Sequence, residues 1–470
     1  NEPSEANKSV LLSLYIPTQD ELAEIMNNGS TYSLIQRGGY MAGSTNSQFR
    51  HLRKKMVYAF STGSVFETTY NFEGKVGLER QCHASRLQKR QTYSFQNQTE
   101  IMSEIKIETL TPVHIGSGRM LIKNNDFCVT KDSEDYDVVA VTDPNKVLSL
   151  IGIEHIDNWV RAIERGNPIN EIINTYAPKG TKVEDYARII DYFGGERVTE
   201  TLKEFIHDGL GRPYIPGSSI KGAIRTAVMA TEADKKDKTE LDIIVKSLKE
   251  KKLSDDIFGE DTNNEKRDVF RFLIISDATF GELNTIAFNM VNINERTKQS
   301  YWDTSKPQLI EALAKEDETT FNIKLDLERY EKSKGHVHEM PECMRSLPDL
   351  FKTINSHTAK LLRSEIEYWE KRKNDDDSDK VEDYISNCRK ILNETTNCEQ
   401  NDKSCILRLG HGCGWRFITG AWSERSDEFY YVKEKARPNN NKYQDYDFPK
   451  SRRVSEDCDL LGFVRLTMKD

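Results

Sequence analysis

The sequence predicts an α+β fold in which a unit of four strands and two helices is repeated. Segments with alternating apolar residues, typical of strands, are separated by amphipathic segments typical of helices. Their order along the chain is β–α–β–β–α–β, twice over, which is the order of ferredoxin-like units. The composition, with 37% hydrophobic and 30% charged residues, is that of a folded globular protein.

The first hundred residues predict a small α+β unit. Strands are expected over 9–16 and 32–44, and a strand–turn–strand over 54–70. A helix is expected over 18–27, with Thr18 as its N-cap and Glu21 completing a capping box. The polar segment 93–104 reads as a linker, so we expect residues 1–101 and 102–470 to fold as separate modules.

A second set of elements begins near residue 102. We expect strands over 103–109 and 126–143, the latter as a hairpin, helices through 144–208, and a helix from 217 to about 233. A helix over 239–252, strands over 268–280, 285–294 and 319–328, a long helix over 348–373 and strands from 404 and over 459–468 complete the prediction. The predicted domains are therefore 102–267, with a helical insertion at about 144–208, and 268–470, with a helical and acidic insertion at about 348–400.

Several classes of protein are disfavoured by composition. No run of 18 apolar residues occurs, so no membrane span is expected. The 8 cysteines include no CxxC pair, which favours reduced thiols in a cytoplasm over a disulfide framework. Cys398, Cys405, Cys413 and His411 could be imagined as zinc ligands, but their spacing fits no standard knuckle. We expect no metal and no cofactor.

Three glycine-containing loops carry the functional prediction: HIGSG at 114–118, IPGSS with Lys221 at 215–221, and LGHGCGW at 409–415. Glycine lets the backbone approach a bulky anion and offers unobstructed N–H donors. None of the loops matches the P-loop or the dinucleotide-binding fingerprint. Three such loops, each near a cation or a hydroxyl, indicate a chain of phosphates rather than a single cofactor.

The second loop opens a predicted helix with two hydroxyls and two cations. A helix N-terminus binds anions, so this stretch could be a phosphate site, with Lys221 and Arg225 on one exposed helical face. It could equally be a capped helix, with Ser218 or Ser219 as the N-cap.

The net charge of −9 argues mildly against a nucleic-acid binder, but the acidic residues are concentrated at 373–383, which reads as a solvated linker. Basic clusters lie elsewhere, at 50–55, 80–90 and 450–453. Together with the glycine loops, they suggest a surface that follows a nucleic-acid backbone.

These motifs resemble a known family. TPVHIGSG, YIPGSSIKGAIRTAV, RFLIISDATF and RLGHGCGW, in this order, resemble the RAMP superfamily of CRISPR proteins over 102–470, and FPKSRR and LLGFVRL resemble its ending. They are most similar to the Csm subunit that caps the guide-RNA 3′ end in type III-A effector complexes. LSLYIPT, SLIQRGGY and HLRKKMVYAFSTGSVFE, within 1–101, resemble the C-terminal half of the Csm subunit that grips the 5′ handle. The chain therefore resembles a fusion of two Csm families, and we expect an upstream segment to complete the first module.

The resemblance implies tandem RRM-like RAMP domains with helical insertions, in a non-catalytic, cytoplasmic subunit that binds guide RNA (crRNA) in antiviral defence. Its implied partners are guide RNA, target RNA, other RAMP backbone subunits and the large polymerase-like subunit, with no membrane. The glycine loops and basic clusters supply the predicted RNA-binding residues: His114, Gly116, Ser117, Gly118, Gly217, Ser218, Ser219, Lys221, Gly222, Arg225, Gly410, His411, Gly412, Gly414, Trp415, Arg416, Lys450, Arg452, Arg453, Arg53, Lys54 and Lys55.

Two other functions remain open. The protein could be a metal-independent RAMP endoribonuclease that processes guide precursor, with His114 or His411 as the general base. Because neither motif contains a companion acid, a hydrogen-bonding role for both residues is favoured. The protein could also be a pure scaffold with structural loops. Trp415 is suited either to stacking on a base or to a core, and Asp277 reads as a turn or cap residue rather than a catalytic carboxylate.

Overall fold

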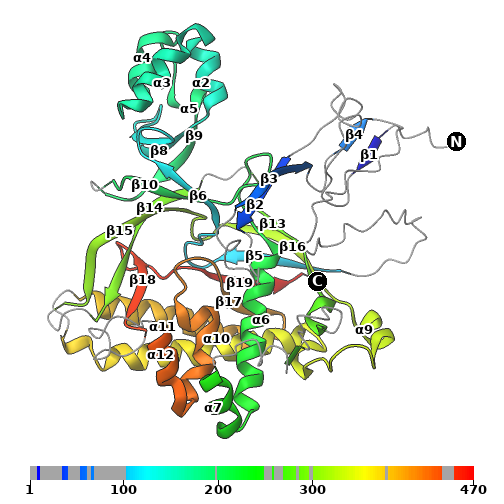
Figure 1. The fold of residues 1–470 in the computed structure, drawn as a ribbon. Helices are drawn as coiled ribbons and strands as arrows, with labels where there is room; N and C mark the ends of the chain where they lie inside the picture. The colour runs from blue at the N-terminus through cyan, green and yellow to red at the C-terminus, as the bar shows by residue number, and fades with distance from the viewer. Residues whose placement is uncertain are drawn as a thin grey trace. The chain divides into compact units, whose positions relative to one another are not determined.

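The computed structural model describes most of the chain beyond residue 101, together with short strands nearer the N-terminus (Figure 1). The described residues are 8–10, 34–40, 53–60, 65–67, 102–195, 198–247, 257–258, 268–281, 285–295, 300–375, 379–436 and 449–469. The chain divides into two compact units, Asn1–Thr99 with Asp208–Gly211, and Glu100–His207 with Arg212–Asp470. In the described part of the chain, no helix has both the length and the apolar character needed to cross a membrane.

The larger unit contains a five-stranded antiparallel sheet in the order β12–β16–β5–β19–β17. Ile105 and Ile107 alternate with polar residues on β5 and are fully buried, as the sequence predicts. The first and last strands of the unit, β5 and β19, are neighbours. The five strands are β5 (Ser103–Thr109), β12 (Leu273–Ile275), β16 (Glu318–Leu325), β17 (Ser404–Arg408) and β19 (Phe463–Met468).

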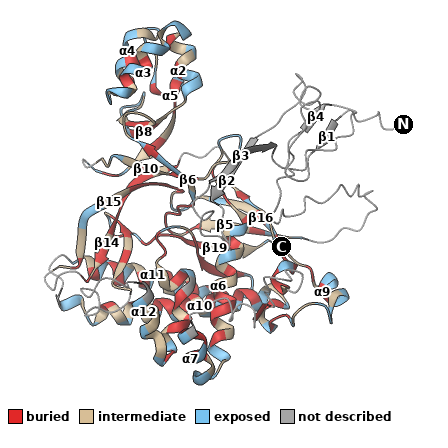
Figure 2. Ribbon diagram, in the orientation of Figure 1, coloured by how far each residue is buried: buried red, intermediate tan, exposed pale blue. Residues whose placement is uncertain are grey.

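Long helices pack against this sheet. Helices α6 (Gly217–Lys235) and α10 (Leu347–Glu370) contact each other and strands of the sheet, and α11 (Lys380–Glu399) contacts α10 and β17. Ile224 of α6, Phe351 of α10 and Ile107 of β5 belong to one buried hydrophobic cluster, and the buried sides of the helices are visible in Figure 2. Burying each such side chain stabilises the fold by roughly 1.5–3 kcal/mol. The predicted helices at 217–233 and 348–373 are confirmed.

A second, curled sheet has eight strands in the order β6–β10–β15–β14–β9–β8–β7, with β18 paired to β14 (Figure 1). The pairs β10–β15 and β14–β9 are parallel, and the others are antiparallel. The strands are β6 (Gly116–Ile122), β7 (Phe127–Lys131), β8 (Asp137–Thr142), β9 (Ala187–Tyr192), β10 (Thr201–Phe205), β14 (Ile286–Asn294), β15 (Trp302–Ala312) and β18 (Ser451–Ser455).

The two sheets confirm the predicted fold class, tandem ferredoxin-like domains with helical insertions. Both sheets draw strands from each side of residue 268, so the chain crosses between them repeatedly. The domain boundaries given by the sequence stay predictions.

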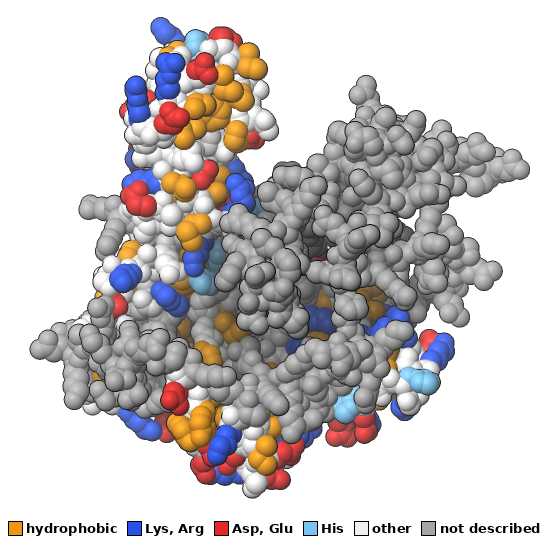
Figure 3. Space-filling view, viewed as in Figure 1, with side chains coloured by type: hydrophobic (Ala, Val, Ile, Leu, Met, Phe, Trp, Pro, Cys, Tyr) orange, Lys and Arg blue, Asp and Glu red, His pale blue; other side chains and the backbone are white. Residues whose placement is uncertain are grey.

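A small helical lobe interrupts the curled sheet between β8 and β9. It contains α2 (Pro144–Ile151), η2 (Ile153–His155), α3 (Ile156–Glu164), α4 (Ile169–Tyr176) and α5 (Val183–Tyr186). Hydrophobic side chains show on its surface (Figure 3), where Ile153 and Val160 are exposed. Part of the region expected to be helical over 144–208 is not helical: Ala187–Tyr192, directly after the short helix α5, forms β9, and Thr201–Phe205 forms β10. Pairing with neighbouring strands overrides helix propensity in these two segments.

Shorter elements complete the larger unit. The strands β11 (Tyr214–Ile215) and β13 (Ala278–Thr279) pair with each other. The helices are α7 (Lys238–Ser247), η4 (Val269–Phe272), α9 (Leu327–Ser333), η5 (Glu342–Met344), η6 (Lys373–Asp375), the π-helix η7 (Arg416–Gly420), η8 (Ala421–Arg425), η9 (Asp427–Phe429) and α12 (Tyr430–Ala436). The acidic segment expected to be a linker contains η6 and the first turn of α11, where Glu382 and Asp383 are favoured by the helix dipole.

The N-terminal unit contains two antiparallel pairs. Strand β1 (Lys8–Val10) pairs with β4 (Val65–Glu67), and β2 (Leu34–Tyr40) pairs with β3 (Arg53–Phe60). Strand β2 continues through Gly38 and Gly39, with a shift of register between Arg37 and Gly39. The helix predicted over 18–27 lies outside the described residues.

Candidate nucleic-acid interface

The first and third glycine loops meet in the structure. The main-chain N–H of His411 donates to the carbonyl oxygen of His114 across 2.8 Å. Gly410 has a φ of +91°, and a Cβ at this position would lie 2.6 Å from the same carbonyl oxygen. Only glycine satisfies both the backbone conformation and the close approach. Two of the three predicted loops therefore form one site.

The joined loops lie against one face of the curled sheet. Strand register places Lys203 of β10 opposite Ile310 of β15, and Gln308 of β15 opposite Met290 of β14. Gln308 and Ile310 are two residues apart on β15, so all of these side chains lie on the same face of the sheet. A Cβ on Gly412 would lie 3.2 Å from the sulfur of Met290, which brings the third loop onto this face.

Arg453 joins the same face, while Arg452 points to the other. On β18, Ser455 lies opposite Met290, and Arg453, two residues away, shares its side of the sheet. Arg452 points to the opposite side and is buried. The sequence cluster KSRR therefore contributes one cation to this face and one to the core.

His411, at the exposed tip of the third loop, is surrounded by cationic side chains. The Lys203 Nζ lies 3.1 Å from His411 Nε2 and 2.9 Å from the Gln308 Oε1. Desolvation, followed by the charges of Lys203, His114 and Arg453, lowers the pKa of His411 to about 4. Desolvation and the charge of Arg453 also lower the pKa of Lys203. This face therefore favours an anion over a further cation.

His114 itself belongs to a buried network. Its Nδ1 donates to the carbonyl oxygen of Glu311, and its ring centroid lies 5.6 Å from that of His411. Only 2% of His114 is exposed. Desolvation lowers the pKa of His114 against the raising effect of Glu311, so its ring stays neutral at neutral pH.

The Glu311 carboxylate anchors this network from the opposite face of β15. It is fully buried, pairs with Arg188, and accepts from the main-chain N–H of Phe205 across 3.0 Å. Burial raises the pKa of Glu311, but the charge and hydrogen bond of Arg188 outweigh burial and lower it. His207 Nε2 lies 3.4 Å from the same carboxylate. The Glu311 carboxylate thus ties β15 to β10, the strand that carries Lys203, while its main-chain carbonyl oxygen holds the His114 ring.

The beginning of β6 is tied to the same region. The Ser117 hydroxyl donates to Glu204 across 2.9 Å, and Gly118 has a φ of +85°. Gly116 begins the strand, and a Cβ there would lie 3.4 Å from His114 Nε2. The first loop thus forms a tight turn that leads into β6, and it is also a candidate RNA contact.

The second glycine loop lies at a different place and already has an anion at its helix N-terminus. The Asp277 Oδ1 accepts from the main-chain N–H of Gly217 across 2.7 Å, as a capping role for Asp277 predicts. A Cβ on Gly217 would lie 2.4 Å from the carbonyl oxygen of Ile275. Pro216 is the N-cap, so the prediction of Ser218 or Ser219 at this position is wrong.

The two cations of this helix have partners within the protein. Lys221 Nζ donates to the carbonyl oxygen of Leu273 across 2.7 Å. Arg225 lies 3.3 Å from Asp268 and places its guanidinium 4.1 Å from the ring centre of Phe258. Both residues are half-buried rather than on the expected exposed face, because they turn toward the segment before β12. Their contact with RNA stays a prediction.

Arg416 and Arg452 converge on one buried carboxylate. Arg416 donates to Glu365 across 2.6 Å, and Arg452 makes a two-bond contact with it at 2.6 and 2.9 Å. Burial raises the pKa of Glu365, but Arg452 and then Arg416 outweigh burial and lower it to about 2. Trp415 lies with its ring 5.7 Å from that of Phe429. These arginines stabilise the core of the larger unit.

The remaining predicted residues are dispersed. Gly222 is exposed on α6, Gly414 has a φ of +79°, and Lys450 precedes β18. Arg53, Lys54 and Lys55 begin β3 in the N-terminal unit, and their side chains lie outside the described set.

Sequence reasoning missed Lys203, Gln308, Glu311 and Arg188. The sequence predicts a helix for the segment that contains Lys203, and no motif marks any of the four residues. No alternation indicates the strand, because Leu202 and Phe205 enclose two charged residues at a spacing that is typical of a helix.

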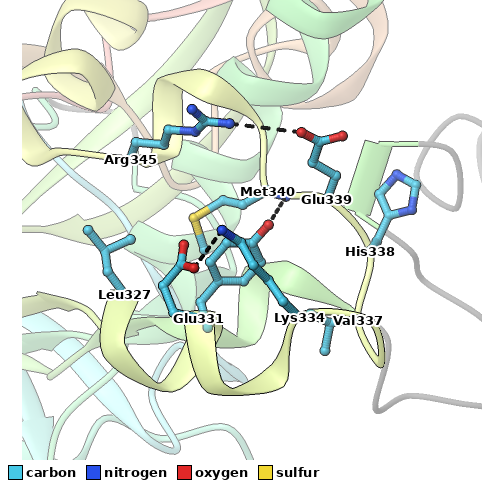
Figure 4. Close-up of a pocket in the computed structure, with 10 residues that line it drawn as sticks. Leu327, Glu331, Lys334, Val337, His338, Glu339, Met340 and Arg345 are labelled. Atoms are coloured by element: carbon cyan, nitrogen blue, oxygen red, sulfur yellow. Dashed lines mark hydrogen bonds and ion pairs between the residues drawn. The ribbon is translucent and has the colours of Figure 1, made fainter.

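A separate pocket of about 520 Å³ lies beside α9 and η5 (Figure 4). Lys334 pairs with Glu331 at 2.5 Å, and Arg345 faces Glu339 at 3.9 Å. The Tyr330 hydroxyl accepts from the main-chain N–H of Met340. None of the predicted site residues lines this pocket, and its cations already face carboxylates.

The described cysteines are free thiols. Burial raises the pKa of Cys413 to about 11, and Cys405 is fully buried. Within the described ranges, no group of three or more His, Cys, Asp and Glu side chains is arranged to hold a metal ion.

Comparison with protein families gives two matches in order along the chain. The model of the RAMP superfamily matches residues 106–416, and that of the CRISPR Csm4 C-terminal domain matches residues 4–94. A CRISPR system Cms protein Csm5 of Methanocaldococcus jannaschii is 29% identical over 201 residues, covering 40% of this chain and 45% of that protein. A CRISPR system Cms protein Csm4 of Mycobacterium tuberculosis is 39% identical over 66 residues, covering 14% of this chain and 21% of that protein. The chain thus spans less than half the length of these curated relatives.

A solved structure shares the fold. A chain in the cryo-EM structure of a Csm–crRNA–target RNA ternary complex of a type III-A CRISPR-Cas system aligns with a TM-score of 0.57 and 18% identity. The alignment covers 78% of this chain and 100% of that chain.

Proposed function

The chain belongs to the RAMP superfamily, and we propose that it is a non-catalytic, guide-RNA-binding structural subunit of a type III-A CRISPR effector complex. The observation that carries this proposal is the junction of the first and third glycine loops beside Lys203 and Arg453. Two cations beside the joined loops, with neutral hydrogen-bonding neighbours, suit a phosphate backbone.

The order of the two family matches supports a finer proposal. Residues 4–94 match the Csm4 C-terminal domain, residues 106–416 match the RAMP superfamily, and part of the chain is similar to Csm5 proteins, so the chain would combine parts of two subunits. We infer that it caps or bridges the RAMP backbone of the complex in the cytoplasm. Its proposed partners are guide RNA, target RNA, other RAMP backbone subunits and the large polymerase-like subunit.

Binding of guide RNA at several salt concentrations tests this function. A protein that contacts phosphates releases counterions, so the logarithm of the binding constant falls linearly with the logarithm of the salt concentration, by about 0.7 for each phosphate of a single strand. We expect measurable binding with a steep slope. Absence of RNA binding by the folded protein would favour a scaffold whose loops are structural.

One observation favours a second candidate, a metal-independent endoribonuclease. His114 and His411 have ring centroids 5.6 Å apart, with Lys203 against His411, and two imidazoles beside an amine can move protons and stabilise a phosphorane. The burial of His114 and the use of its Nδ1 by Glu311 argue against it.

Incubation of labelled guide precursor in EDTA separates the two functions. We expect His114→Ala and His411→Ala to leave RNA processing unchanged, and to weaken guide retention by at most about 1–2 kcal/mol. A cleavage product made by the natural protein and lost in His411→Ala would establish the enzyme.

A further inference from the structure

The face of the curled sheet beside the joined loops presents two cations with neutral neighbours. Lys203 comes from β10 and Arg453 from β18, and His411 reaches the same face from the third loop. The hydrogen-bond partners of Lys203 Nζ here are the neutral Gln308 and His411. Among the described side chains, no carboxylate forms an ion pair with Lys203 or Arg453; Asp303 acts on Arg453 only through its more distant charge.

This arrangement differs from the other cation clusters of the molecule. Arg416 and Arg452 are neutralised by Glu365, Arg188 by Glu311, and Arg225 by Asp268. Desolvation and the charge of Arg453 lower the pKa of Lys203, and desolvation lowers the pKa of Arg453 against the raising effect of Asp303. An anion placed between them would relieve this repulsion.

We propose that Lys203, His411 and Arg453 form a binding site for one backbone phosphodiester of single-stranded RNA. This inference rests on the proposed function and names the contact through which the RNA backbone crosses the curled sheet. The nonbridging oxygens of the phosphodiester accept hydrogen bonds from the ammonium and guanidinium groups. Gly410 and Gly412 let the third loop pack closely against His114 and Met290, which holds His411 beside Lys203.

Phosphate binding at this site changes the protonation of His411. In the free protein His411 accepts from Lys203 and its pKa is about 4, so the ring is neutral at neutral pH. The charged and titratable groups that face it are Lys203, Arg453 and His114. An anion that engages Lys203 and Arg453 removes their repulsion and favours the imidazolium, so RNA binding takes up protons and strengthens as the pH falls.

The experiment measures binding of a fluorescent single-stranded RNA by anisotropy at several salt concentrations. Lys203→Gln and Arg453→Gln each remove one charged donor, and we expect each to weaken binding roughly tenfold. The salt slope should fall in either variant by at most about 0.7, the share of one single-strand phosphate, because the other cation still contacts that phosphate. Lys315→Gln is the matched control, because Lys315 is exposed in the turn between β15 and β16 and already lies 3.3 Å from the Glu316 carboxylate. The control should bind as the natural protein does.

The ¹H–¹³C NMR signal of the His411 ring in the natural protein gives a second, mutation-independent measurement. RNA should shift it toward the imidazolium position at pH 6, and His411→Gln identifies the signal. Inorganic phosphate at the same phosphate concentration is the second probe, and we expect a smaller shift from it.

The outcomes separate the site from the proposed function. If the natural protein binds RNA, but Lys203→Gln and Arg453→Gln match Lys315→Gln and the His411 signal stays unmoved, the site is refuted and the function stands. If inorganic phosphate alone reproduces the shift of the His411 signal, and Lys203→Gln leaves the affinity for RNA unchanged, the site binds free phosphate and the inference fails. If the natural protein binds no RNA, the proposed function fails.

Discussion

The carbonyl oxygen of His114 accepts a hydrogen bond from the main-chain N–H of His411, and this 2.8 Å contact joins two loops from opposite ends of the larger unit. The contact depends on main-chain atoms and on the absence of a side chain at Gly410. It therefore fixes the position of the His411 ring beside Lys203 whatever the protonation state of either histidine.

Gly410→Ala should disrupt this contact. The left-handed backbone and the 2.6 Å approach to the His114 carbonyl oxygen together should lower the free energy of unfolding by roughly 2–4 kcal/mol. Gly414→Ala is the control, since its φ is +79° but no atom lies within 4 Å of the added Cβ, and it should cost roughly 1–2 kcal/mol. Urea unfolding and RNA anisotropy measure both effects. Equal losses in the two variants would show that the contact between the loops does not matter.

Removing the Glu365 charge should destabilise the larger unit strongly. Glu365→Gln leaves Arg452 buried without its counter-ion and leaves Arg416 with Glu424 alone, and we expect a loss of roughly 3–5 kcal/mol in the free energy of unfolding. Glu367→Gln, on the same helix but exposed and paired with Lys371, should cost at most about 1 kcal/mol. Similar urea midpoints for both variants would contradict the assigned role.

The same carboxylate gives the fold an acid limit. The pKa of Glu365 is lowered from 4.5 to about 2, so its stabilising contribution is complete above pH 4.5 and is lost as the pH falls toward 2. Urea unfolding of the natural protein between pH 6 and 2.5 should show this loss. In Glu365→Gln the dependence on pH in this window should be weaker, and an unchanged dependence would assign the acid limit to other carboxylates.

Lys221 offers a test between a structural and an RNA-binding role. Lys221→Met keeps the apolar stem but leaves the carbonyl oxygen of Leu273 without its donor, so we expect stability to fall by about 1–3 kcal/mol. RNA affinity should change less than in Lys203→Gln. Unchanged urea unfolding, together with a reduced salt slope, would instead support the predicted phosphate contact at this helix.

Limited proteolysis tests the two-module organisation. We expect the first cuts between about residues 91 and 103, because this polar segment separates the matches to two families and lies at the boundary between the two compact units. Mass spectrometry of the fragments locates the cut. Protection of this segment under conditions that cut elsewhere would favour one shared core.

The sequence by itself determined the local features. Alternating Ile105 and Ile107 marked β5, apolar spacing marked α6 and α10, and the glycine motifs in order indicated the RAMP superfamily. These features depend on neighbours a few residues away along the chain, so they can be read from it directly.

Only the tertiary structure decided which charged side chains are available to bind an anion. Arg452 and Arg453 are adjacent, yet strand alternation sends Arg452 to Glu365 in the core and Arg453 to the opposite face of the curled sheet, where it is half-buried. The sequence predicts an exposed face for Lys221 and Arg225. In the structure their side chains turn inward instead, toward partners 52 and 43 residues further along the chain. Lys203 carried no motif, and it gained significance because strand pairing places β10 beside β15 and the third loop brings His411 to its amine. The availability of a charge depends on the groups that folding brings around it, and these groups are distant in the sequence.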